Sequence, residues 1–192
     1  MQKNVNPHKL KLILIMGMFA LPVVASYLAY FVWPPQGAAR NYGTLIKPET
    51  LSNALALTAL DGTALTLRSL RGKWLIVQVD AAACAANCEK KLYAMRQVRL
   101  MQGREQDRVQ RLWVLTDGQA PRAAIQQKYE GMQLVRDPYR ALIKKLVADG
   151  DITQYIYMID PLGNVMMRWP SDPDIKRMHK DIERLLKASQ IG

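Results

Sequence analysis

The chain has few residues of the types that carry most enzymatic chemistry. Its 192 residues include only two cysteines and two histidines, and 16 acidic residues stand against 27 basic ones. It contains no glycine-rich phosphate loop, no metalloprotease helix and no serine nucleophile elbow. These absences argue against nucleotide hydrolysis, zinc proteolysis and serine hydrolysis. They leave the two thiols, Cys84 and Cys88, as the side chains best suited to chemistry.

A second absence is that of charge between Leu12 and Ala39, where no Asp, Glu, Lys or Arg occurs. Residues 12–33 are the most apolar part, and a helix of that length spans roughly 33 Å, enough to cross a bilayer core. The sequence therefore predicts a transmembrane helix over 12–33. A cleaved signal peptide is the alternative, with Gly37-Ala38-Ala39 as a weak cleavage site, but the apolar stretch is long for one.

The charges before this segment predict its orientation. Lys3, Lys9 and Lys11 precede it without an acidic residue, which by the positive-inside rule keeps residues 1–11 in the cytoplasm. We therefore expect a single-pass protein of a bacterial inner membrane whose remaining residues lie in the periplasm.

The rest of the chain has the size of one ordinary domain. Pro34 and Pro35 break the helix, so residues 34–53 are expected to form a tether and residues 54–192 the domain. Beyond residue 39 the formal net charge is +8, which suits anionic lipid or an acidic protein partner as well as simple solubility. Nucleic acid is not expected on that side of a membrane.

Hydrophobic periodicity predicts an α/β fold with parallel strands first and an antiparallel edge later. The predicted elements are a hairpin over 54–68, a central strand over 74–79, a helix after the cysteines ending at Gly103, a strand over 109–116, a helix over 122–129, a strand over 133–135, a helix over 139–148, a hairpin over 152–169 and a terminal helix from Asp172-Pro173.

The cysteines follow the central strand, at the edge where α/β sheets usually carry their sites. Asn87 is the expected N-cap of the next helix, which places Cys88 in its first turn and Cys84 on the loop before it. We expect Cys84 to be the exposed attacking thiol and Cys88 the resolving one. Asp80 is expected to be a solvated carboxylate at the end of the strand, with a proton relay as the alternative.

Neighbouring charges bear on the thiol chemistry. The helix N-terminus, Lys90 and Lys91 favour thiolate, whereas Glu89 opposes it. Further along, Arg96, Arg99 and Arg104 fall off the apolar stripe and give this helix a basic outer face.

The pair allows three uses. A structural disulfide is one, although so short a loop removes little unfolded-state entropy. Thiol-disulfide exchange is the second. Copper binding is the third, because two thiolates can hold Cu(I), a soft ion that accepts low coordination, whereas zinc would want four ligands.

Several segments together resemble a known family. They are Asp61-Gly62, Leu67 to Trp74, the strand Leu75 to Val79, the Cys84 and Cys88 pair, and Tyr157 to Val165. Their order looks like the thioredoxin fold, and more narrowly resembles the SCO/SenC family of cytochrome c oxidase assembly proteins. The resemblance implies a membrane-tethered thioredoxin-like domain that helps to build an oxidase copper centre, with an oxidase subunit or another respiratory-chain assembly protein as partner.

The chain departs from the family pattern at two places. The family's proline after the second cysteine is Glu89 here, and its distal metal-binding histidine would fall at or near Ile152. The only histidines are His8, before the apolar segment, and His179, which is expected to be a surface residue of the terminal helix. These departures favour thiol-disulfide exchange, leave a Cu(I) carrier as the second hypothesis, and make a redox-inactive assembly scaffold the third.

Overall fold

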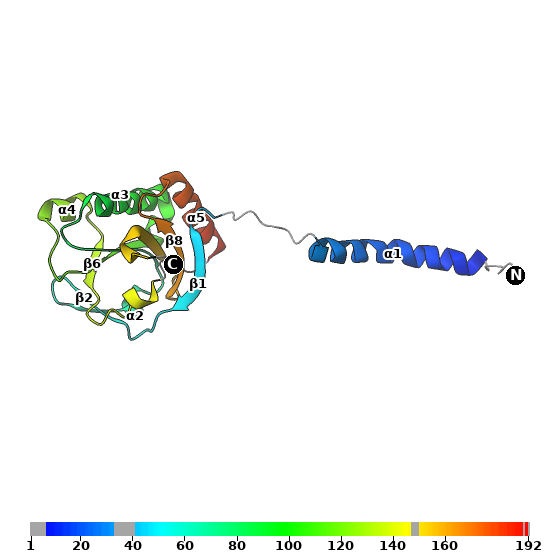
Figure 1. Cartoon of the computed structure of the whole chain (residues 1–192), viewed down its shortest axis with the longest axis horizontal. Coiled ribbons are helices and arrows are strands. Elements are labelled where there is room, and N and C mark those ends of the chain that lie inside the picture. The colour runs from blue at the N-terminus through cyan, green and yellow to red at the C-terminus, as the bar shows by residue number, and fades with distance from the viewer. Residues whose placement is uncertain (1–6, 33–40, 147–149, 190, 192) are drawn as a thin grey trace. The chain divides into compact units, whose positions relative to one another are not determined.

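The structure is a computed structural model, and it describes residues 7–32, 41–146, 150–189 and 191. The chain consists of two compact units, residues 1–40 and residues 41–192. In the first unit, helix α1 (Pro7–Val32) is long and apolar enough to cross a membrane by length and composition (Figure 1). Pro22 lies inside it. Residue 33 and the Gly37-Ala38-Ala39 stretch lie outside the described residues.

The second unit is built on an eight-stranded mixed sheet with the order β1-β8-β7-β4-β5-β6-β2-β3. The strands are β1 (Thr44–Thr50), β2 (Ala56–Ala59), β3 (Ala64–Thr66), β4 (Trp74–Asp80), β5 (Val109–Leu115), β6 (Gln133–Arg136), β7 (Tyr155–Ile159) and β8 (Asn164–Pro170). Strands β4, β5 and β6 pair in parallel, and all other pairs are antiparallel. The mixed α/β sheet predicted from the sequence is therefore confirmed, with both hairpins in place.

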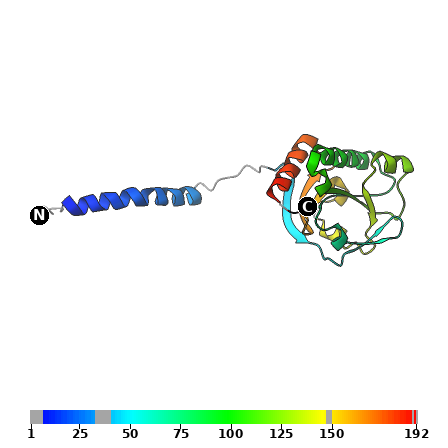
Figure 2. The ribbon, with the colours of Figure 1, turned by 180° about the vertical axis from the view of Figure 1, so that it is seen from behind.

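Helices cover both faces of the sheet. They are α2 (Leu67–Leu70), α3 (Ala86–Met101), α4 (Ala123–Lys128) and α5 (Ile175–Ala188), with the 3-10 helices η1 (Gly103–Arg108), η2 (Ile143–Lys145) and η3 (Ile152–Gln154). Both views of the ribbon place α3, α4 and α5 on one side of the sheet (Figures 1 and 2), and α2 lies on the other (Figure 1).

Strand β4 is buried along its whole length, because side chains alternate between two cores. Leu75, Val77 and Val79 face the core on the α2 side. Trp74 and Ile76 face α3 and α5 on the other side. The strand thus sits at the centre of the domain and delivers the cysteine loop at its carboxyl end.

Two predictions of local structure differ from what is observed. The sequence predicts a tether over 34–53, whereas Thr44–Thr50 form β1 at the edge of the sheet, paired with β8. The sequence also predicts a helix over 139–148, and the described residues there form only turns and η2. The carboxylate of Asp137 accepts hydrogen bonds from the backbone N–H groups of Ala141, Leu142 and Ile143, which holds this segment as a turn.

The start of β1 is attached to α5 by one buried carboxylate. Asp181 accepts hydrogen bonds from the N–H groups of Tyr42 and Gly43 and from the indole of Trp169. A Cβ at Gly43 would lie 2.5 Å from Trp169 Nε1 and 2.7 Å from Met167 Sδ. Only glycine fits this close approach, which fixes the point where the domain begins.

Candidate functional site

The two cysteines occupy the turn between the central strand and the helix that follows it. Cys84 lies on the loop after β4 and Cys88 in the first turn of α3, and they form a disulfide with a Cα–Cα distance of 5.1 Å. The helix begins two residues earlier than predicted, with Ala85 as its N-cap in place of Asn87. The amide of Asn87 instead donates to Gln154 Oε1 at 3.3 Å. The predicted placement of Cys88 in the first turn is unchanged.

Both cysteines are buried, so the expectation that Cys84 is exposed is wrong. Cys84 is 5% exposed and Cys88 2%. They pack into a small apolar cluster against α3, β5 and α4, together with Ala82, Leu92, Trp113, Leu115, Ile125 and Tyr129. In contrast, Ala81, Ala83, Ala85 and Ala86 around the pair are exposed and small. The surface around the buried pair therefore consists of small side chains.

The loop that carries Cys84 has an unusual backbone conformation. Cys84 has a φ of +44°, a left-handed value that costs a residue with a Cβ roughly 1–3 kcal/mol and persists only where its surroundings impose it. Here the N–H of Cys84 donates to Ala81 O at 3.1 Å. The N–H of Ala82 donates to both carboxylate oxygens of Asp117, at 3.0 and 3.1 Å. Asp117, on the loop after β5, thus holds the disulfide loop in place.

Beneath Cys88 lies a buried amide that the sequence analysis did not single out. Gln78 of β4 is fully buried, and its Nε2 donates to Cys88 Sγ at 3.6 Å. Its Oε1 has no hydrogen-bond partner among the residues that the structure describes. Gln78 is the one polar residue within the apolar run 74–79, and this break in the run is the signal that could have identified it from the sequence. A donor aimed at sulfur favours the thiolate when the pair is reduced.

A buried ion pair lies one turn further along α3. Lys91 is fully buried, and its Nζ lies 2.5 Å from Asp80 Oδ2. The same ammonium donates to Thr153 O at 2.5 Å and to Val79 O at 3.4 Å. The prediction that Asp80 is a solvated carboxylate is therefore wrong. Helical spacing could have revealed Lys91, which lies three residues after Cys88 and four before Met95 on the buried stripe.

Burial shifts the titration of both partners toward their neutral forms. The pKa of Asp80 is raised by burial, and the charge and hydrogen bond of Lys91 oppose this shift. The pKa of Lys91 is lowered by burial, again opposed by Asp80. Removing two charges from water is costly, and the attraction between them recovers this cost only in part.

The charged residues that directly follow Cys88, Glu89 and Lys90, each form an ion pair near the surface. Glu89, in the place of the family's proline, forms an ion pair with Lys128 of α4 at 2.6 Å. The hydrogen bond and charge of Lys128 lower the pKa of Glu89. Lys90 pairs with Asp172 at 2.6 Å. Glu89 thus opposes thiolate formation less than an unpaired carboxylate would.

The place of the family's third metal ligand holds no ligand in this chain. Ile152 begins η3 and packs against the apolar core on the far side of the sheet. The neighbouring Thr153 contributes its carbonyl to the Lys91 ammonium. Among the described residues there is no group of three or more His, Cys, Asp or Glu side chains able to hold a metal ion.

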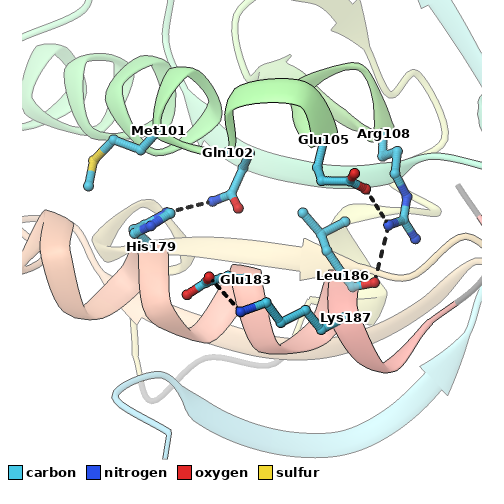
Figure 3. A pocket seen from close by; sticks show the side chains of 8 residues that line it. All are labelled: Met101, Gln102, Glu105, Arg108, His179, Glu183, Leu186 and Lys187. Atoms are coloured by element: carbon cyan, nitrogen blue, oxygen red, sulfur yellow. Dashed lines mark hydrogen bonds and ion pairs between the residues drawn. The ribbon is translucent and has the colours of Figure 1, made fainter.

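His179 lies at the other end of α3 from the cysteines. It is half-buried on α5, and its Nδ1 lies 3.0 Å from Gln102 Nε2. Figure 3 shows the two side chains pointing toward each other across a pocket between the end of α3, η1 and α5. Gln102 follows Cys88 by 14 residues, which along a helix is roughly 20 Å. His179 therefore belongs to the contact between α3 and α5 and not to the cysteine site.

The fold of the domain is shared with solved SCO structures. The SCO1/SenC family lipoprotein from Bacillus anthracis is 20% identical, with 74% of this chain and 99% of that chain covered and a TM-score of 0.56. Apo Sco1 from Thermus thermophilus is 17% identical over 78% and 100% of the two chains, with a TM-score of 0.59. ScoI from Bradyrhizobium japonicum, a structure with copper bound, is 20% identical over 74% and 100%, with a TM-score of 0.53.

These likenesses confirm the thioredoxin-like fold predicted from the sequence. No curated protein matches the chain in sequence. A family model does match, over residues 74–189, which run from the central strand through the terminal helix and include both cysteines. The chain thus belongs to the family described as transmembrane-like, thioredoxin-like, C-terminal domain.

Proposed function

We propose that this protein is an SCO-related, membrane-anchored thiol-disulfide exchange protein that acts in the assembly of the cytochrome c oxidase copper centre. The observation that carries the proposal is the Cys84–Cys88 disulfide, which lies between the central strand and α3 of a thioredoxin-like domain. The buried donor of Gln78 and the buried Lys91–Asp80 pair lie beside it. Helix α1 serves as the anchor, with the N-terminus cytoplasmic and the domain in the bacterial periplasm.

In the proposed reaction the reduced pair reduces a disulfide between the copper-ligating cysteines of an oxidase subunit. The Cys84 thiolate attacks one sulfur of the partner disulfide, which forms a mixed disulfide and releases one partner thiolate. The Cys88 thiolate then attacks Cys84 Sγ, and the second partner thiolate leaves. Two electrons pass to the partner, and this chain ends in the oxidised form described above.

The residues around the pair support the thiolate that this reaction needs. Cys88 lies in the first turn of α3, where the helix dipole favours negative charge. Gln78 donates to its sulfur, and the Lys91 ammonium lies on the next turn. Burial of Cys84 restricts attack to a partner that displaces the loop, which gives the exchange its selectivity.

A Cu(I) carrier is the second candidate, favoured by the short spacing of the two sulfur ligands. ScoI from Bradyrhizobium japonicum was solved with copper bound. Here Cys84 and Cys88 would hold Cu(I) as a two-coordinate cargo once reduced. The residues fit a third ligand poorly, because Ile152 stands in its place and a buried ammonium lies beside it.

The test is a redox titration of the full-length protein in nonionic detergent against glutathione, with thiol trapping, with and without Cu(I). We expect a reversible couple between about −120 and −270 mV, the range of known exchange proteins, and weak Cu(I) binding. Cys84→Ser and Cys88→Ser should each abolish the two-electron couple. Tight stoichiometric Cu(I) binding by the reduced pair would instead support the copper carrier.

A pair that resists reduction and binds no copper would refute both chemical functions. An assembly scaffold with a structural disulfide would then remain. In that case Cys84→Ser/Cys88→Ser would retain full assembly of the oxidase in cells, whereas the exchange mechanism requires that assembly be lost.

A further inference from the structure

A pocket of about 380 Å³ lies beside α3, on the far side of the Glu89–Lys128 ion pair from the cysteines, and nothing in the exchange mechanism uses it. It is formed by the second half of α3, the start of β5, and the end of α4 with the turn that follows. The lining residues are Arg96, Arg99, Leu100, Arg111, Gln127, Lys128, Glu130 and Gly131. Arg96 follows Cys88 by eight residues, roughly 12 Å along the helix.

Arg111 of β5 brings a buried positive charge to this pocket. It is 4% exposed, and its Nη2 donates to the backbone carbonyl of Glu130 at 2.5 Å. Its Nε and Nη1 are enclosed and have no hydrogen-bond partner within the described part of the chain. Burial and the nearby charges of Arg99 and Arg96 lower the pKa of Arg111 to about 10, so it remains charged at neutral pH. A buried guanidinium without a counterion is costly, and its field extends into the pocket.

The remaining charges around the pocket leave this positive field only partly balanced. Arg99 donates to Val109 O at 2.8 Å and contacts Asp107, a highly exposed carboxylate, at 3.2 Å. Lys128 is paired with Glu89. Arg96 is exposed and makes no ion pair with a described residue, and the carboxylate of Glu130 makes none either. Among the described residues that line the pocket, Glu130 is therefore the carboxylate that opposes an anion.

We propose that this pocket binds a phosphate-type oxyanion between Arg96 and Arg99, with the charge of Arg111 behind them. A tetrahedral dianion offers oxygens in several directions and matches more than one guanidinium. A single carboxylate, with one charge and two oxygens, is satisfied by one arginine and would leave the other charges uncompensated. The phosphate would come from solution or from a lipid whose headgroup is a phosphomonoester, which carries the same terminal phosphate.

The experiment is calorimetric titration of the full-length protein in phosphatidylcholine nanodiscs with inorganic phosphate at constant ionic strength. We expect saturable binding that Arg96→Glu weakens at least about tenfold, the loss of one charge-assisted hydrogen bond. The matched control is Arg68→Glu, the same change on α2, on the other side of the sheet, which should leave phosphate affinity within about twofold. Glu130→Gln should strengthen binding, since it removes the opposing charge.

The contribution of Arg111 is tested by a separate variant with a folding control, because replacing this buried side chain changes the packing of the interior. Arg111→Met removes the charge and keeps most of the side-chain volume, and circular dichroism would report whether the domain folds. A folded Arg111→Met protein should bind phosphate more weakly than wild type. If it does not fold, the Arg96→Glu and Glu130→Gln results decide the question.

Nanodiscs of equal parts phosphatidylcholine and phosphatidic acid, a phosphomonoester lipid, distinguish the two phosphate sources. A site for free phosphate keeps its wild-type affinity in both lipids, whereas a headgroup site loses apparent phosphate affinity through competition from phosphatidic acid. The proposal is overturned if phosphate does not bind saturably, or if Arg96→Glu and Arg68→Glu weaken it equally. Tighter binding of a tetraglutamate peptide than of phosphate, with the same dependence on Arg96, would also overturn it in favour of an acidic protein ligand.

Discussion

Replacing Lys91 by methionine should destabilise the domain, because it leaves Asp80 buried without its counterion. Lys91 is fully enclosed, and its ammonium contacts Asp80, Thr153 O and Val79 O. Methionine keeps the length and apolar stem of the side chain, so the change is mainly one of charge. Removing one partner of a buried ion pair typically costs about 3–5 kcal/mol.

We expect the lower end of this range, about 3 kcal/mol, because the Asp80 side chain is 12% exposed and can take up a proton. For a domain of this size that loss corresponds to a fall in Tm of about 6–12 °C. Lys91→Met/Asp80→Leu removes both charges and should recover most of the loss, since replacing a whole buried pair by apolar groups is often neutral or stabilising.

The pH dependence provides a second check on the same variant. Burial already raises the pKa of Asp80, and without Lys91 the folded-state pKa rises further above the unfolded value. Folded Lys91→Met therefore binds a proton that the unfolded chain does not, at pH values between these two pKa values. Its stability increases as pH falls through that window, so the difference from wild type should shrink from pH 7 toward pH 4.

The assay is chemical unfolding of the full-length, oxidised protein in detergent, followed by tryptophan fluorescence. Trp74, Trp113 and Trp169 are all buried in the domain and report its unfolding. A Lys91→Met protein within about 0.5 kcal/mol of wild type at pH 7, which is about a twofold change in the folding equilibrium constant, would refute the ion pair as described. So would a difference that grows as pH falls.

Three further predictions concern the disulfide, the buried amide of Gln78 beside it, and the close packing at Gly43. Reducing the Cys84–Cys88 bond should cost at most about 2 kcal/mol of stability, because closing so short a loop removes little entropy from the unfolded chain and reduction relieves the backbone strain at Cys84. Calorimetry with and without reductant measures this cost, and a loss above about 4 kcal/mol would indicate a structural disulfide. Gln78→Leu should leave stability within about 1 kcal/mol but make the reduction potential more negative by on the order of 30 mV, because a donor to the thiolate is lost; an unchanged potential in the glutathione titration would contradict this. Gly43→Ala should lower thermal stability by about 1–3 kcal/mol through overpacking against Trp169 and Met167, and an unchanged Tm would show that β1 can shift.

The sequence predicted those parts of the fold whose pattern is local and strong. The apolar run at β4 and the hairpin signals at Asp61-Gly62 and Asp160 to Gly163 each specify one element with little ambiguity. The position of the cysteine pair at the end of the central strand follows from that order. Its pairing as a disulfide is a consequence of the loop that joins β4 to α3.

The parts that were not predicted depend on side chains distant in sequence. Residues 139–146 have a composition that suits a helix, but Asp137 binds three successive N–H groups and holds a turn. Residues 44–50 look like linker, with exposed positions at most sites, and become a strand only because β8 offers an edge. The burial of Cys84 likewise depends on Trp113, Ile125 and Tyr129, which arrive from β5 and α4.

The polar groups beside the disulfide are the strongest argument that its role is chemical. Gln78 and Asp80 follow Trp74 and Ile76 at alternate positions of β4, so all four face α3. Apolar residues would pack at positions 78, 80 and 91 without the unpaired amide oxygen of Gln78 or the desolvated charges of Asp80 and Lys91. Such replacements would not lower the stability of the core. A disulfide needed only as a staple has no use for such neighbours. A thiol that must become a thiolate does, because a donor such as Gln78 Nε2 beside Cys88 Sγ stabilises its charge.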